Sequence, residues 1–187
     1  TASPPRADEE PEARAIAFLG REVPRWSREN RCFSCHNNGD GARALIAATG
    51  TRFAPPVASL QTTLDFLARP DDWKHGDEPA FKDTRLARLQ FASALASSLA
   101  GRPKDRRDPL VRAAGGLARD QAPDGSWPID DASPIGSPVT YGPHLATAIA
   151  VRTLREADAR RFQASIQRAE GWLRGHPPRN VVEASAI

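Results

Sequence analysis

The chain has 187 residues, of which 40% are hydrophobic, so it is long enough for one domain, or at most two, with a sizeable core. Its 26 basic and 23 acidic residues give a net charge of only +3, and the signs are interspersed, which argues against nucleic acid as a partner. No apolar run approaches the roughly 20 residues that span a bilayer, so we expect no transmembrane segment.

Residues 1–11 are rich in proline and acidic side chains and nearly lack large apolar groups, which predicts a flexible leader. The remaining residues, 12–187, are expected to form one helical domain. The chain contains no methionine, so Thr1 is not a translation start. We therefore expect that an upstream segment was removed, and a signal peptide is one possibility.

Beyond the leader, apolar residues recur at three- and four-residue spacing, which is typical of helices that bury one face. The segments with this pattern or with an alanine-rich composition are 42–48, 60–67, 86–99, 110–117, 145–157 and 162–173. Alternating β-branched residues are absent. The sequence therefore predicts an all-α fold.

The predicted helices also repeat along the chain about every 50 residues. The equivalent points are Phe18-Leu19, Phe66-Leu67, Gly116-Leu117 and Trp172-Leu173, and after the first three a tryptophan is expected in the following loop, at Trp26, Trp73 and Trp127. Each unit thus consists of a helix, a tryptophan-bearing loop and a second, alanine-rich helix. This order predicts stacked αα-hairpins. Because the last unit stops inside its second helix, we expect the natural protein to continue.

Residues 116–127 contain the string Q-A-P-D-G-S-W from Gln121 to Trp127. It resembles the Q-x-x-D-G-S-W repeat of the squalene–hopene cyclase and prenyltransferase superfamily. The resemblance implies a partial α/α toroid in which Gln121 and Trp127 tie a helix end to the next loop. It also keeps a cyclase-like enzyme fragment among the alternatives.

The only two cysteines, Cys32 and Cys35, precede His36 in the pattern C-x-x-C-H, the signature of covalent haem attachment. On a tightening helical turn the two thiols can each add to one vinyl group of the same porphyrin, while the histidine supplies the proximal nitrogen. This resembles the haem site of c-type cytochromes and implies haem c as the cofactor. The small polar residues from Asn37 to Gly41 are expected to leave room at the porphyrin edge.

Three other interpretations of the cysteines remain open. A thioredoxin-like redox pair requires a βαβ context, which this sequence does not indicate. A structural zinc ion requires four ligands, which two cysteines and one or two histidines could supply. A local disulfide or unreacted thiols are the third interpretation.

Further side chains are candidates for the haem environment. Trp26 precedes the motif by six residues and is expected to wall one haem face or to serve the repeat as a structural tryptophan. Arg31 is expected to neutralise haem propionates or to lie in a solvated turn. Because methionine is absent, the second axial ligand is expected to be His75, which follows Trp73 in the loop equivalent to the haem segment; His144, His176 and an open site are the alternatives.

These observations predict an exported, periplasmic or otherwise extracytoplasmic c-type haem protein that transfers electrons to an unidentified redox partner protein. One alternative is a haem-free repeat scaffold that binds proteins on its concave surface. The other is an enzyme fragment, either cyclase-like or peroxidase-like.

Overall fold

The computed structural model describes residues 10–31, 33–73, 84–101, 107–129 and 142–185. Within these ranges every regular element is helical and no strand forms, so the all-α prediction is confirmed. In chain order the elements are α1 (Pro11–Asn30), the π-helical turn η1 (Cys35–Gly41), α2 (Ala42–Ala48), α3 (Ala58–Leu67), the 3-10 turn η2 (Pro70–Asp72), α4 (Thr84–Leu99), α5 (Asp108–Arg119), α6 (Pro143–Asp158), α7 (Gln163–Gly175) and α8 (Val181–Ser185).

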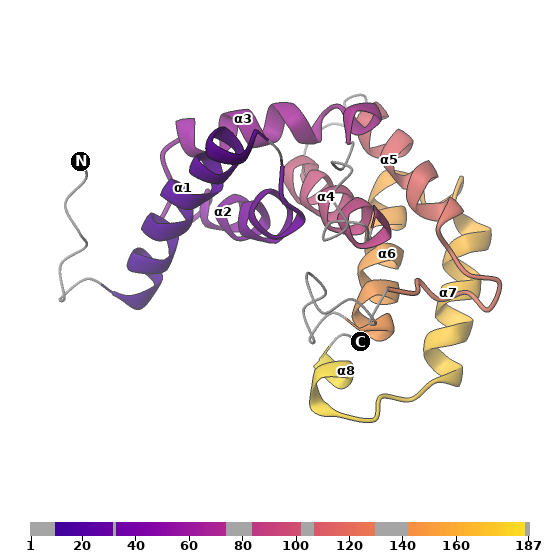
Figure 1. Cartoon of the computed structure of the whole chain (residues 1–187). Helices are drawn as coiled ribbons and strands as arrows, with labels where there is room; N and C mark the ends of the chain where they lie inside the picture. The colour runs from indigo at the N-terminus through magenta and orange to yellow at the C-terminus, as the bar shows by residue number, and fades with distance from the viewer. Residues whose placement is uncertain (1–9, 32, 74–83, 102–106, 130–141, 186–187) are drawn as a thin grey trace.

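The helices follow an arc that runs from α1 at one end to α7 and α8 at the other (Figure 1). Helices α2, α4 and α6 form a continuous row, because α4 packs against both of the others. The remaining long helices cover this row: α1 contacts α2 and α3, α5 contacts α4 and α6, and α7 contacts α6. The turn η1 lies where α1, α2 and α4 meet, so three helices support it.

The helices that the apolar spacing predicted are observed, with α7 beginning one residue later than expected. Helix α5 illustrates why the sequence forms them. Pro109 lies in its first turn, where a missing N–H has no consequence, and Asp108 and Arg119 complement the helix dipole at its two ends. Leu110 and Leu117, two turns apart, are fully buried on the inner face.

Helix α4 is the centre of the molecule. Most of its side chains from Leu86 to Ala96 are buried, as expected for a helix with neighbours on several sides. They join side chains of α5, α6 and α7 in the larger of two core clusters, while Val23, Leu45 and Leu60 belong to a smaller cluster between α1, α2 and α3. None of the described helices combines the length and the apolarity that a bilayer crossing requires.

Two of the three expected tryptophan-bearing connections bind back to the preceding helix. Trp127 is buried, and its Nε1 donates a hydrogen bond to the carbonyl oxygen of Leu117, 2.8 Å away. Trp73 follows η2, and its Nε1 donates to the carbonyl oxygen of Phe66 at 3.2 Å. Each indole therefore closes the C-terminal end of the helix that precedes it.

The segment around Gln121 joins α5 to α7. Gln121 Nε2 donates to the carbonyl oxygens of Gly125, at 3.0 Å, and Ser165, at 2.9 Å. Gly125 has φ +99°, and a Cβ there would lie 2.5 Å from the carbonyl oxygen of Arg168. Only glycine combines this backbone angle with this close approach to α7.

The expected loop at Trp26 is wrong, because this residue lies inside α1. Buried or half-buried Leu19, Val23 and Ser27 continue one face of that helix past Pro24, so the chain remains helical to Asn30. Of the leader predicted for residues 1–11, the first nine lie outside the described residues and Pro11 is the first residue of α1.

Candidate functional site

The turn that carries Cys35 and His36 begins at a capping serine. Helix α1 ends at Asn30; the next residue, Arg31, has the left-handed φ of 49°, and the backbone is extended at Ser34. Ser34 Oγ accepts hydrogen bonds from the backbone N–H groups of His36, at 3.3 Å, and Asn37, at 3.4 Å. This is the arrangement of a helix N-cap, and it defines the backbone of the two motif residues that follow.

The buried side chain of Asn38 stabilises the turn with two hydrogen bonds. Its Oδ1 accepts a hydrogen bond from the backbone N–H of Ser34 at 3.0 Å, and its Nδ2 donates to Thr63 Oγ1 of α3 at 2.9 Å. Asn38 and Thr63 are both completely buried. Because buried polar groups are stable only when they are hydrogen-bonded, this bridge fixes η1 on α3.

Two glycines let the turn approach the surrounding helices. A Cβ on Gly39 would lie 2.9 Å from Gln90 Cβ of α4, and a Cβ on Gly41 would lie 3.1 Å from Val23 Cγ2 of α1. The segment from Asn37 to Gly41 therefore packs against protein, with Asn38 and Gly39 buried. The expectation that these residues are small in order to leave room at a porphyrin edge is wrong for this buried pair.

The expected single helical turn through both cysteines is not observed. Phe33 and Ser34 are not helical, and η1 begins only at Cys35. Cys32 lies outside the described residues. A π-helical turn is rare and is found frequently at functional sites.

Cys35 and His36 lie at the boundary between core and solvent. Cys35 is half-buried and packs against the larger core cluster, whereas His36 is exposed. The turn therefore directs one thiol towards the core and leaves the neighbouring imidazole accessible from outside.

An aromatic cluster adjoins the turn, and no pattern in the sequence indicated it. The rings of Phe33 and Phe66 are stacked with centroids 3.8 Å apart and planes at 2°. Phe91 meets Phe66 edge-on at 5.0 Å, and Trp73 lies 5.5 Å from Phe91. The four rings come from three separate segments, around residue 33, residues 66–73 and residue 91, so spacing along the chain could not have revealed the cluster.

Trp26 and Arg31, the other predicted site residues, lie at the end of α1 that leads into the motif. Trp26 is one turn beyond Val23, which contacts η1, and its Nε1 is buried without a hydrogen-bond partner. Arg31 is exposed. Trp26 thus carries a buried N–H donor without a partner, which is uncommon in folded proteins.

The electrostatics of the turn centre on Asp40. Burial raises the pKa of this carboxyl above its ordinary value of 3.8, and the Arg43 charge, the hydrogen bond from Gln90 and the His36 charge oppose this only in part. Gln90 Nε2 donates to Asp40 Oδ2 at 2.5 Å, while Gln90 Oε1 is buried without a partner.

The structure brings two of the other histidines together at the opposite end of the arc. His144 Nε2 lies 2.8 Å from the carbonyl oxygen of His176, and its Nδ1 lies 3.8 Å from Glu183 Oε2. The ring of His176 stacks on Trp172 with centroids 4.6 Å apart. Both histidines line a cavity of about 490 Å³ between α6, α7 and α8. His75 lies outside the described residues.

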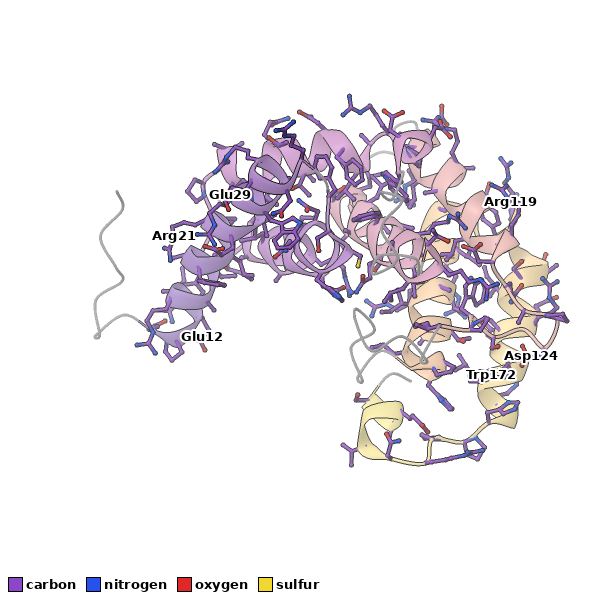
Figure 2. All side chains as sticks on the ribbon, viewed as in Figure 1. Glu12, Arg21, Glu29, Arg119, Asp124 and Trp172 are labelled. Carbon is purple, nitrogen blue, oxygen red and sulfur yellow. The ribbon has the colours of Figure 1, made fainter. Side chains whose placement is uncertain are left out.

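In the part of the chain that the structure describes, no group of three or more His, Cys, Asp or Glu side chains is arranged to hold a metal ion. At the α7 end of the arc, Asp124 and Trp172 lie beside each other (Figure 2). Comparison with models of protein families, with curated proteins and with solved structures found no significant match.

Proposed function

We propose that this chain is an exported c-type haem protein that transfers electrons, with haem bound covalently to Cys32 and Cys35 and its iron ligated by His36. The observation that carries the proposal is the capped turn at Ser34. It fixes Cys35 and His36 as neighbours at the edge of the core, with the imidazole exposed. Covalent attachment needs a thiol that can reach a vinyl group of the porphyrin, and the iron needs an accessible proximal nitrogen.

The residues of the turn fit the chemistry of this cofactor. Thiols form the thioether bonds and imidazole is a proximal ligand of haem iron. The porphyrin itself supplies four nitrogen ligands, so a cluster of three protein ligands is not needed at this site. The buried Nε1 of Trp26, which has no partner, is a donor that a haem carboxylate could satisfy.

When bound, haem supplies an iron that changes between the ferric and ferrous states. The chain's own residues set the conditions for that change. Ser34 and Asn38 hold the backbone of the ligand turn rigid, and rigid support of a ligand reduces reorganisation around the metal. The stacked rings of Phe33 and Phe66 exclude water on the core side of the turn.

We propose His75 as the second axial ligand. The alternatives His144 and His176 already have hydrogen-bond partners beside α8. The His144 ring bonds to the carbonyl oxygen of His176, and the His176 ring bonds to the carbonyl oxygen of Trp172. A His75 ligand on a chain without methionine favours low-potential electron transfer, because thioether ligation is what raises the potential of many small cytochromes.

The scaffold is proposed to be a part of an α/α toroid built from stacked αα-hairpins. The row α2, α4 and α6, covered by α1, α3, α5 and α7, is the order of inner and outer helices that such a fold requires. The arc of Figure 1 and the hydrogen bonds of Gln121 and Trp127 support this assignment.

A visible spectrum tests the proposal directly. The chain is expressed with an export signal in a bacterial host that has cytochrome c assembly machinery. We expect a pyridine haemochrome signal typical of haem c and an intact mass that exceeds the polypeptide by one haem. A colourless protein with the bare polypeptide mass would contradict the proposal and leave the repeat scaffold as the better interpretation.

Three histidine variants assign the ligands. His36→Ala should abolish the low-spin spectrum, and His75→Ala should convert the iron to high spin. The matched control is His176→Ala, at the other end of the arc, which should leave the spectrum unchanged. An unchanged spectrum for His75→Ala would remove this residue as the second ligand without affecting the attachment at Cys32 and Cys35.

A further inference from the structure

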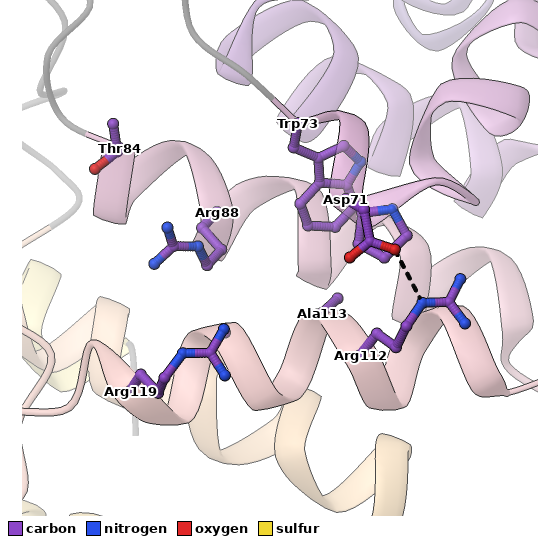
Figure 3. A pocket seen from close by; sticks show the side chains of 9 residues that line it. Asp71, Trp73, Thr84, Arg88, Arg112, Ala113 and Arg119 are labelled. Carbon is purple, nitrogen blue, oxygen red and sulfur yellow. Dashed lines mark ion pairs between the residues drawn. The ribbon is translucent and has the colours of Figure 1, made fainter.

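A second feature of the molecule is a cavity of about 510 Å³ between η2, α4 and α5. Three arginines line it, Arg88 from α4 and Arg112 and Arg119 from α5, with Trp73 on one wall (Figure 3). Arg88 and Gln90 are two positions apart, so their side chains leave α4 about 200° apart around its axis. Because Gln90 faces η1, the cavity lies on another face of α4 from the proposed haem turn.

Two guanidinium groups converge on one point of this cavity. A Cβ on Gly116 would lie 3.5 Å from Arg88 Nε and 3.8 Å from an Nη of Arg119. Because Gly116 has no side chain, the stem of Arg88 packs closely against α5 there, and the Arg88 and Arg119 guanidinium groups lie beside the same turn of this helix. Like charges this close repel one another unless an anion lies between or beside them.

The carboxylates of the described residues compensate only two of the three arginines. Arg88 forms an ion pair with Asp120, whose side chain is largely buried. Arg112 pairs with Asp71 at 3.3 Å, but both partners are exposed, so this contact contributes little and opens easily. Within the described ranges no carboxylate lies at ion-pair distance from Arg119, so its guanidinium remains available to a ligand.

We propose that this cavity binds a small organic anion through a carboxylate or phosphate group. Arginine presents a planar fork of N–H donors that matches both groups in a bidentate manner. The oxyanion lies on the cavity side of Arg88 and Arg119 and accepts hydrogen bonds from their guanidinium groups. Arg112 faces the same cavity and adds positive charge at its other end.

Trp73 indicates the remainder of the ligand. Its only hydrogen-bond donor, Nε1, is already bound to the carbonyl oxygen of Phe66. The indole therefore offers the cavity an apolar surface and no polar contact. The cavity therefore has arginines on one side and the apolar indole on the other. A molecule with an oxyanion at one end and an apolar body at the other fits both surfaces.

Isothermal titration calorimetry with two probes, inorganic phosphate and citrate, tests the proposal at constant ionic strength maintained with sodium chloride. We expect one or both to bind, and the stronger probe identifies the group, phosphate or carboxylate. Arg119→Gln should weaken binding about tenfold, because it removes a charged donor from an exposed position without a structural partner. The matched control is Arg152→Gln on α6, outside the cavity, which should bind as the unaltered chain does.

Gly116→Ala provides a variant that should fold at least as well. Alanine favours the helix over glycine, and the nearest atom to the new Cβ is the flexible Arg88 Cδ at 3.1 Å. The methyl group would nevertheless push the stem of Arg88, and with it the guanidinium group, away from its place beside Arg119, so binding should weaken while the melting temperature is maintained. Failure of both probes to bind beyond the chloride control, or unchanged affinity in both Arg119→Gln and Gly116→Ala, would overturn the proposal.

Discussion

The bridge that Asn38 forms inside η1 gives the sharpest test of the structure. In Asn38→Ala the backbone N–H of Ser34 and the hydroxyl of Thr63 both lose their partner. Since Thr63 is completely buried, water cannot replace the lost contact there. Leaving a buried polar group without a partner costs about 1–3 kcal/mol. The N–H of Ser34 is only partly buried, so the cost for this group lies at the lower end of that range.

Together these losses predict that Asn38→Ala lowers the free energy of unfolding by about 2–4 kcal/mol. This is a large fraction of the roughly 5–15 kcal/mol that stabilises a typical domain. Thr63→Val removes the hydroxyl that Asn38→Ala leaves unsatisfied. In a Thr63→Val background the same substitution should therefore cost about 1 kcal/mol less.

Urea unfolding followed by far-ultraviolet circular dichroism measures these differences. The matched control is Asn37→Ala in the same turn. Asn37 contributes only its backbone N–H to the cap, so alanine preserves the contact and the effect should stay within about 0.5 kcal/mol. Equal stabilities of Asn38→Ala and Asn37→Ala would refute the role assigned to the buried bridge.

Two further predictions test other parts of the structure. Gly125→Ala should lower the melting temperature markedly, because its φ of +99° costs about 1–3 kcal/mol for a residue with a Cβ and because that Cβ would lie 2.5 Å from a carbonyl oxygen of α7. Gly171→Ala, with open space around it in α7, should instead raise the melting temperature slightly, and a similar change in both variants would contradict the assigned contact. The raised pKa of Asp40 means that the folded state holds a proton that the unfolded state releases, so this residue should reduce stability as the pH rises from about its ordinary value of 3.8 to the raised value. Asp40→Asn should flatten that part of the pH dependence measured by urea unfolding, and an unaltered pH dependence would show that Asp40 titrates normally.

The local pattern of the sequence was sufficient to predict the helices. Leu110, Ala114 and Leu117 of α5, for example, mark one helical face without reference to any other segment. The prediction failed at Trp26, where the repeat of tryptophan-bearing loops favoured a loop. There the burial of Val23 and Ser27 against neighbouring segments keeps the chain helical, which overrides the local signal.

The spacing of Cys32, Cys35 and His36 identified the candidate turn. It did not identify the residues whose hydrogen bonds stabilise that turn. A serine four positions before an asparagine is a weak capping signal, and only the fold shows that Asn38 reaches Thr63. The small residues of the turn were interpreted as space for a cofactor. Gly39 and Gly41 instead allow η1 to approach α4 and α1, which becomes visible only when these segments are placed.

The sequence by itself determined the fold class, the positions of most helices and the thiol–imidazole motif, because each of these depends on residues within a few turns of one another. Only the tertiary structure decided what surrounds them. The stacking of Phe33 on Phe66 and the convergence of Arg88 and Arg119 over Gly116 join residues from separate elements. Such contacts are set by how helices pack across the arc, and packing depends on the whole set of side-chain shapes rather than on spacing along the chain.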